Sequence, residues 1–359
     1  MPVVPFRPQP STLPLPTHWV LGASQGRVSL LLSKRAVLVN MVLLLALLAA
    51  ATASLGMGSV KLTPTEVWLA LLGEGSPTHQ LVVKELRLLR VLAGIGTGAA
   101  FALSGCLMQT LARNRLATPG IIGIDNAATA FAVASVIGVG TTLAPPAMSL
   151  VGAIVATVLI FALAGGSGTQ GYRFIVVGLG IGAIAGAVTQ LILSWVAIDA
   201  ANAAFPWTVG SLNARSPATL ALLGAGLGVC LPWAYGLVRG LNALRISDTV
   251  PITLGVKVQW LRGQSLLLAV ALTGLAVAVA GPVGMVALLG PEIARMLCRH
   301  RGIPLLAAAL TGALLMVLAD LLGRVLLAPL EIPVGIITAV VGSPYLLWML
   351  LNPNVRNQP

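Results

Sequence analysis

Charged side chains are scarce in this sequence. They account for 8% of its 359 residues, while hydrophobic residues account for 57%; a soluble globular domain carries about 25% charged residues. A chain this apolar has too little polar surface to cover a water-facing exterior, which excludes a soluble fold. Its long apolar runs are continuous rather than alternating, which excludes an outer-membrane barrel. The composition therefore predicts an all-α polytopic membrane protein.

Motifs for nucleotide hydrolysis and metal chemistry are also missing. A phosphate loop requires a Gly-Lys pair, and the sequence contains no such dipeptide. It contains no HExxH metal motif. We therefore expect a pore subunit rather than an enzyme, with no cofactor and no metal site. Three cysteines without metal or disulfide spacing are expected to be small packing residues: Cys106, Cys230 and Cys298.

Ten apolar windows approach the roughly 20 residues that a transmembrane helix needs. They cover residues 36–56, 88–110, 118–140, 145–166, 173–197, 217–238, 263–280, 282–298, 303–323 and 334–351. The boundaries of the third and eighth windows are the least sharply defined.

Basic residues predict the orientation of these spans. If the N-terminus is cytoplasmic, fifteen of the 21 Lys and Arg residues fall on the cytoplasmic side. This asymmetry supports ten spans with both termini in the cytoplasm. It also accounts for the net charge of +12 without invoking nucleic acid, because the basic residues are scattered between apolar segments.

Residues 1–33 differ from the rest of the chain because they are rich in proline and polar side chains. Proline at this density prevents a helix, so we expect a disordered N-terminal extension. The transmembrane domain then covers residues 34–352, and residues 353–359 form a cytoplasmic tail. The extension lacks an apolar core with a cleavage site, so it is not expected to be a signal peptide.

Two similar segments suggest an internal repeat. Residues 97–105 read TGAAFALSG and residues 273–281 read TGLAVAVAG, with five of nine positions identical. They fall in the second and seventh spans, which run in opposite directions, so an inverted-topology repeat is predicted. Chance similarity in a chain rich in Ala and Gly is the alternative.

Three longer segments stand out from the apolar background. They read RLLRVLAGIGTGAAFALSGCLMQTLARNRLATPGIIG at 87–123, GPVGMVALLGPEIAR at 281–295 and ADLLGRVLLAPLEIPVGIITAVVGSP at 319–344. In this order and spacing they resemble the FecCD-type permease subunits of the ABC importers for iron siderophores and vitamin B12, over about residues 35–351. Further segments are most similar to the ferric-enterobactin-type subunit: YRFIVVGLGIG at 172–182, WTVGSLN at 207–213 and GSPYLLWMLL at 342–351.

The resemblance implies a type II ABC importer permease fold in a bacterial inner membrane. Two permease subunits of ten helices each, here non-identical, would flank a central path. Two cytoplasmic ATPase subunits would dock below, and a periplasmic siderophore-binding protein would deliver cargo from above. The implied function is import of a ferric siderophore, with cobalamin or haem as alternative cargoes.

The sequence departs from the family's usual pattern at three places. Leu89 stands where the family has a proline at the mouth of the second span, Arg115 replaces a proline after that span, and Glu292 replaces a histidine in the eighth span. The first two changes are expected to alter the local backbone. The third changes the charge near the cytoplasmic surface.

Three arginines at predicted outer ends of spans are exceptions to the positive-inside bias: Arg87, Arg90 and Arg324. The resemblance implies that they dock the binding protein through its glutamates, and a planar guanidinium can bind a carboxylate bidentately. The alternatives are snorkelling to lipid headgroups or, for Arg324, an ion pair with Asp320 or Glu331.

Residues 245–258, RISDTVPITLGVKV, form the longest polar interruption of the second half. The resemblance implies a pair of short helices that seat in the ATPase, and Asp248, Leu254 and Gly255 match the family's pattern there. An ordinary cytoplasmic loop is the alternative.

Ionisable residues at membrane depth are functional or paired by default. Glu292 and Arg295 lie three residues apart on one predicted helical face and are expected to pair, while Asp320 lies in the ninth span. The resemblance also places an inner gate at Gln170, Gly171 and Tyr172. Two polar residues of the fifth span are candidates to line the path: Gln190 and Ser194.

Two other classes of protein are weighed against an importer permease. An ion-coupled secondary transporter would need several carboxylates or histidines at the membrane midplane, and only Asp320 and Glu292 are candidates. A membrane enzyme acting on lipid-linked substrates would need clustered catalytic side chains at one interface, which the sequence lacks.

Overall fold

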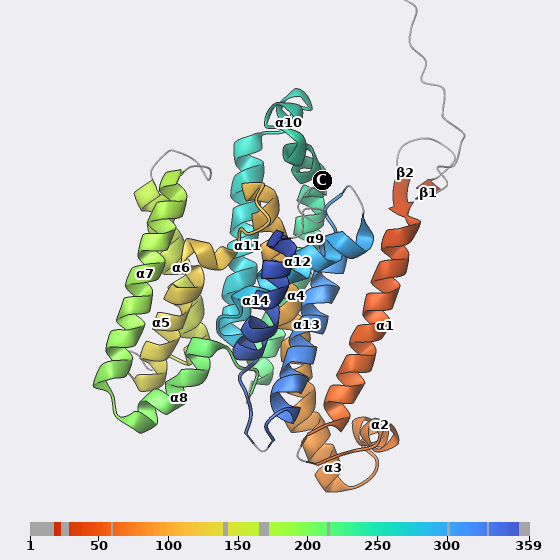
Figure 1. Ribbon diagram of the computed structural model, residues 1–359, viewed down its shortest axis with the longest axis vertical. Coiled ribbons are helices and arrows are strands. Elements are labelled where there is room, and N and C mark those ends of the chain that lie inside the picture. Colours follow the sequence, from red (N-terminus) through yellow and green to blue (C-terminus); the bar gives the residue numbers. More distant parts are fainter. Residues whose placement is uncertain are drawn as a thin grey trace, which may run out of the picture.

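The computed structural model describes residues 18–22, 29–58, 60–138, 143–164, 172–213, 216–299, 302–328 and 330–351. Most of the long helices run along one common axis (Figure 1). The predicted all-α class is therefore confirmed, apart from one short hairpin before the first helix.

The first half of the chain contains β1 (His18–Gly22), β2 (Ser29–Ser33), α1 (Lys34–Gly56), α2 (Pro64–Leu72), α3 (Pro77–Leu81), the π-helical turn η1 (Val82–Leu88), α4 (Leu89–Ala112), the 3-10 turn η2 (Pro119–Ile122), α5 (Ile124–Ile137) and α6 (Pro145–Ala164). The second half contains α7 (Tyr172–Trp195), α8 (Ile198–Val209), α9 (Pro217–Ile246), α10 (Thr249–Thr253), α11 (Val258–Ala280), α12 (Gly284–Cys298), α13 (Leu305–Val325) and α14 (Val334–Leu351).

Each of the ten predicted windows coincides with a helix: α1, α4, α5, α6, α7, α9, α11, α12, α13 and α14. Among the described residues, seven helical stretches are long and apolar enough to cross a membrane. The other three helices are α5 with 14 residues, α12 with 15 and α14 with 18. Seven crossings are thus supported by length and composition, and the total of ten stays a prediction.

The bundle has two distinct ends. Helix α10 caps one of them, where α1 begins and α14 ends, while α2, α3 and α8 lie at the other (Figure 1). We call these the α10 end and the α2 end.

Helix α4 forms the centre of the bundle. It packs against α9, α11, α12 and α13, and its second half is almost entirely buried. Glycine permits this close approach, because small residues let helix backbones touch. A Cβ added at Gly105 would lie 1.8 Å from the carbonyl oxygen of Ala287, and one at Gly98 would lie 2.3 Å from that of Gly312.

The two segments of the suspected repeat contact each other. The Ser104 hydroxyl of α4 lies 2.7 Å from the Thr273 hydroxyl of α11 and donates to the Ala269 carbonyl at 2.6 Å. Helix α4 starts beside α3 at the α2 end, whereas α11 starts beside α10, so the two helices run in opposite directions (Figure 1). This arrangement is what an inverted repeat requires, although the repeat itself stays a prediction.

The second span begins earlier than the sequence indicates. Residues Pro77–Ala112 form one continuous helical stretch, so Arg87, which lies just outside the predicted window 88–110, is on the same helix as Arg90. Leu89 explains part of this difference, because it supplies the backbone N–H that the family's usual proline lacks.

Ten residues of the N-terminal extension also differ from the expectation of disorder. Strands β1 and β2 pair antiparallel, with His18 opposite Ser33. Both strands, HWVLG and SLLLS, are free of proline and rich in apolar residues, which suits a strand. Residues 1–17 and 23–28 lie outside the described residues.

Replacement of Gly105 by alanine tests the central packing. The added methyl group would overlap the α12 backbone, and overpacking of this kind costs about 1–3 kcal/mol. We expect a lower melting temperature in detergent for Gly105→Ala. Gly224→Ala in α9 is the matched control, because an added Cβ there meets nothing within 4 Å; equal melting temperatures for the two variants would contradict the close helix contact.

Candidate functional site

A network of buried charges lies at the α2 end. The carboxylate of Asp320 on α13 lies between two guanidinium groups: Nε of Arg90 is 2.8 Å from Oδ1, and Nε of Arg324 is 3.1 Å from Oδ2. A second carboxylate, from Glu331, lies 2.8 Å from Nη1 of Arg90. These pairs join α4, α13 and the loop that leads to α14.

The same network reaches the C-terminal end of α1 through backbone carbonyls. Arg87 donates to the carbonyl oxygens of Leu55 at 2.7 Å and Val60 at 2.6 Å. Arg324 donates to the carbonyls of Met57 and Ser54, each at 3.2 Å, and to the Ser54 hydroxyl. The arginines therefore satisfy carbonyl groups in the last turn of α1 and just after it; a helix leaves the carbonyls of its last turn without internal partners.

This geometry changes the interpretation of the three predicted docking arginines. Arg87 is buried and its Nη atoms donate to backbone carbonyls, so the structure does not present it at the surface. The side chains of Arg90 and Arg324 are only 11% and 7% exposed. Glu331, at 47% exposure, is the accessible ionic group of this network. The alternative pairing of Arg324 with Asp320 is confirmed, and Glu331 pairs with Arg90.

A second network, at the α10 end, surrounds Asp248. Its carboxylate accepts from Nη2 of Arg262 at 2.9 Å and from Arg113, which also donates to the Leu244 carbonyl at 3.0 Å. Arg262, helped by Arg113, holds the pKa of Asp248 below its ordinary value. The predicted coupling segment is thus attached to the end of α4 and to α11 near its start.

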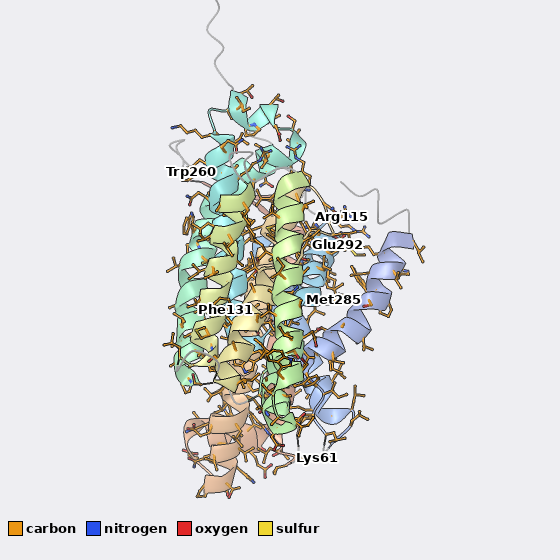
Figure 2. All side chains as sticks on the ribbon, turned by 90° about the vertical axis from the view of Figure 1, so that its left-hand side faces the viewer. Lys61, Arg115, Phe131, Trp260, Met285 and Glu292 are labelled. Carbon is orange, nitrogen blue, oxygen red and sulfur yellow. The ribbon has the colours of Figure 1, made fainter. Side chains whose placement is uncertain are left out.

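The tip of the coupling segment is apolar and exposed. Leu254 is 69% exposed, Ile252 is also exposed, and so is Trp260, which follows the segment in the first turn of α11. Gly255 ends the short helix with φ of +75°, a left-handed conformation that favours glycine. Trp260 lies near this end of the bundle, whereas Lys61 lies at the other (Figure 2). The segment therefore exposes large apolar side chains, and the ion pairs of Asp248 with Arg113 and Arg262 attach it to the bundle.

Glu292 is the most buried carboxylate of the α10 end, with 2% of its side chain exposed. It accepts from Arg295 at 2.8 Å, which confirms the predicted pair, and from Arg115 at 3.1 Å. Arg115 and Glu292 lie close together in Figure 2. Arg295 also donates to the side chain of Gln109 on α4, so α12 and the end of α4 share one polar cluster.

The predicted gate and path residues lie on α7 or just before it. Gln190 and Ser194 are exposed on α7, where the Ser194 hydroxyl donates to the Leu191 carbonyl at 2.8 Å. Tyr172 is the first residue of α7. Gln170, Gly171 and the side chain of Tyr172 lie outside the described residues.

Several participants were not identified from the sequence. Arg113, Arg262 and Gln109 belong to the α10-end network, but they are far in sequence from the carboxylates or amides they meet. Asp125, in the first turn of α5, is buried, and its Oδ1 has no hydrogen-bond partner among the described residues. The feature of the sequence that could have drawn attention to Asp125 is its position just after the glycine-rich turn at 120–123.

The described part of the chain contains no group of three or more His, Cys, Asp or Glu residues that could hold a metal ion. All three cysteines are buried and free, as expected of packing residues. Long apolar helices, exposed apolar flanks and a charged network at each end define a polytopic helical membrane protein.

Comparison with known proteins identifies the family. Residues 44–352 match the FecCD transport family, and the chain belongs to it. The achromobactin transport system permease protein CbrC of Dickeya dadantii is 36% identical over 336 residues, which are 92% of this chain and 96% of that protein. The ferric enterobactin transport system permease protein FepG of Escherichia coli is 34% identical, covering 89% and 97%. The hemin transport system permease protein HmuU of Yersinia pestis is 35% identical, covering 86% and 94%.

A solved structure shares the fold. It is an inward-facing conformation of a metal-chelate type ABC transporter, with a TM-score of 0.76 and 25% identity over 88% of this chain and 99% of that one. The resemblance inferred from the sequence motifs is therefore confirmed.

Removal of the central carboxylate tests the α2-end network. Asp320→Asn would leave Arg90 and Arg324 without their shared buried counter-charge, and breaking a buried pair in this way costs about 3–5 kcal/mol. Glu331→Gln removes a half-exposed partner and should cost less than about 1 kcal/mol. Thermal unfolding in detergent measures both; similar losses for the two variants would show that Asp320 does not organise the network.

Proposed function

We propose that this chain is the transmembrane permease subunit of an ATP-driven importer that moves a ferric siderophore from the periplasm to the cytoplasm. The observation that carries the proposal is the FecCD match over 44–352, which covers the helical bundle from within α1 to the end of α14. Relatives named for achromobactin and ferric enterobactin transport favour a siderophore as cargo. The similarity to a hemin transport permease keeps haem as the alternative, with cobalamin within the same class.

A separate subunit would hydrolyse ATP. The sequence has no Gly-Lys dipeptide and therefore no phosphate loop. The exposed apolar tip around Leu254 is suited to seat in a cleft of that ATPase, because a polar loop without a partner has no need for large apolar side chains at its surface. The α10 end would then face the cytoplasm, with both termini on that side.

Motion of the ATPase would reach the membrane through Asp248. Its bonds to Arg113 and Arg262 connect the segment to α4 and α11, and these two helices pack together through Ser104 and Thr273. A push on α10 would therefore move α4 and α11 together. Glu292 and Arg295 would extend the same connection to α12.

The periplasmic binding protein would dock at the α2 end. Because Arg87, Arg90 and Arg324 are engaged within the chain, docking would proceed by exchange: a carboxylate of the binding protein would replace Glu331 on Arg90. Arg87 and Arg324 would keep the end of α1 in place at the docking surface through their hydrogen bonds to its backbone carbonyls. The partner permease would be a non-identical subunit that faces Gln190 and Ser194 across the path. The inner gate would lie near Gln170, Gly171 and Tyr172.

Uptake of iron-55 complexed with a panel of siderophores tests the cargo. Cells that lack the gene should lose uptake of one siderophore class, and the wild-type gene should restore it. Radiolabelled cobalamin and haem uptake are measured in parallel. Loss of cobalamin or haem uptake alone would overturn the siderophore assignment, and no loss of any cargo would overturn the importer.

Replacement of Leu254 by aspartate tests the coupling tip. Burial of a leucine contributes about 1.5–3 kcal/mol, so its loss should reduce ATP-driven uptake by about tenfold or more while the protein still inserts and folds. Leu254→Met, which keeps an apolar side chain of similar volume at the tip, is the matched control and should keep uptake near the wild-type level. Normal uptake by the Leu254→Asp variant would argue against docking of the ATPase at this tip.

A further inference from the structure

Four arginines line one cavity at the α10 end. The cavity has a volume of about 200 Å³, and its walls include Arg113 and Arg115 from the end of α4, Arg245 from α9 and Arg295 from α12. We call it the arginine pocket. Pro304, which precedes the first turn of α13, closes another side.

The carboxylates of this region do not balance the positive charge of the pocket. Glu292 is shared by Arg115 and Arg295. Asp248 is shared by Arg113 and Arg262. These two carboxylates can neutralise at most half of the charge of the four lining arginines. The positive charges of Arg295 and Arg115 also act on Arg245, so the pocket concentrates like charges that an anion would stabilise.

The pocket also contains hydrogen-bond donors suited to an anion. Nε of Arg295 is buried and has no hydrogen-bond partner among the described residues. Helix α13, with 21 residues, begins at the pocket without a side-chain cap. The N-terminus of a helix carries a partial positive charge and favours anions.

The flanks of the pocket are those of a membrane-facing surface. Tyr235 on α9 lies close to the backbone of Leu306 on α13, two residues after Pro304. Tyr235, Trp233 and Leu306 are each partly exposed. Aromatic residues of this kind gather at the headgroup level of a bilayer, and basic pockets between transmembrane helices bind the head groups of anionic lipids.

We propose that the arginine pocket binds a phosphate group, supplied by an anionic membrane lipid whose chains lie against α9 and α13. The four guanidinium groups would contact the phosphate oxygens, and the start of α13 would add to the attraction. Binding would connect α4, α9, α12 and α13 at the end of the bundle that carries the coupling segment.

The test uses the full-length protein in phosphatidylcholine nanodiscs with and without phosphatidylglycerol. Native mass spectrometry measures the phosphatidylglycerol that stays bound after release from the nanodisc. Because a basic residue near an anionic membrane contributes about 1 kcal/mol, Arg245→Gln should weaken retention by about fivefold. Arg245→Lys, which keeps the charge, should retain more lipid than Arg245→Gln and shows that the site tolerates replacement.

Arg239→Gln is the matched control, because Arg239 is exposed on the same helix and is not among the residues that line the pocket. It should retain phosphatidylglycerol as the wild type does. Equal retention by Arg245→Gln and Arg239→Gln would overturn the lipid site. A thermal-shift titration with inorganic phosphate distinguishes the sources: stabilisation that depends on Arg245, without lipid retention, would assign the pocket to soluble phosphate, and absence of both effects would overturn the proposal.

Discussion

An ion buried in an apolar bundle must be paired, because lipid and closely packed helices offer it no water. The seven ion pairs among the described residues all lie in two networks, one at each end. Asp320 organises the first, and Asp248 and Glu292 organise the second. Between them, α4 meets its neighbours through small residues and hydroxyl groups such as Ser104 and Thr273. The ion pairs are therefore confined to the two ends of the bundle, and the contacts of α4 between the ends are made by small residues and hydroxyl groups.

Helix α4 connects the two networks. It carries Arg90 near one end and Gln109 near the other, and Arg113 follows its last turn. The close approach at Gly98 and Gly105 leaves little room for α4 to slide against α12 and α13. A force applied at the α10 end would therefore be transmitted along α4 rather than absorbed by loose packing, which is what an importer with its ATPase on one side and its binding protein on the other requires.

The sequence predicted the parts of the site that depend on local spacing. The i to i+3 spacing of Glu292 and Arg295 and the i to i+4 spacing of Asp320 and Arg324 place each pair on one helical face. Both pairs are present, the first as expected and the second as the alternative to docking by Arg324. The apolar windows located the helices for the same reason. The polar run at 245–258 identified the segment that contains α10.

Contacts between distant segments could not be predicted in this way. Arg90 meets Asp320 across 230 positions of sequence, and Arg113 meets Asp248 across 135. No periodicity encodes such pairings, so Arg90 was expected to be available for docking and Arg113 was counted only as a loop charge. The helical residues 77–87 were missed because an apolar window ends where charged residues such as Arg87 begin, although a helix does not.

The central claim is that this chain forms the path of an ATP-driven importer. The most direct measurement is reconstitution of the chain with its partner permease, ATPase and binding protein in proteoliposomes, followed by transport of iron-55 siderophore. The account predicts accumulation that requires ATP hydrolysis and all the components, and that falls by about tenfold or more in the Leu254→Asp variant. Accumulation that proceeds without ATP and follows an imposed ion gradient would contradict it and would identify a secondary transporter.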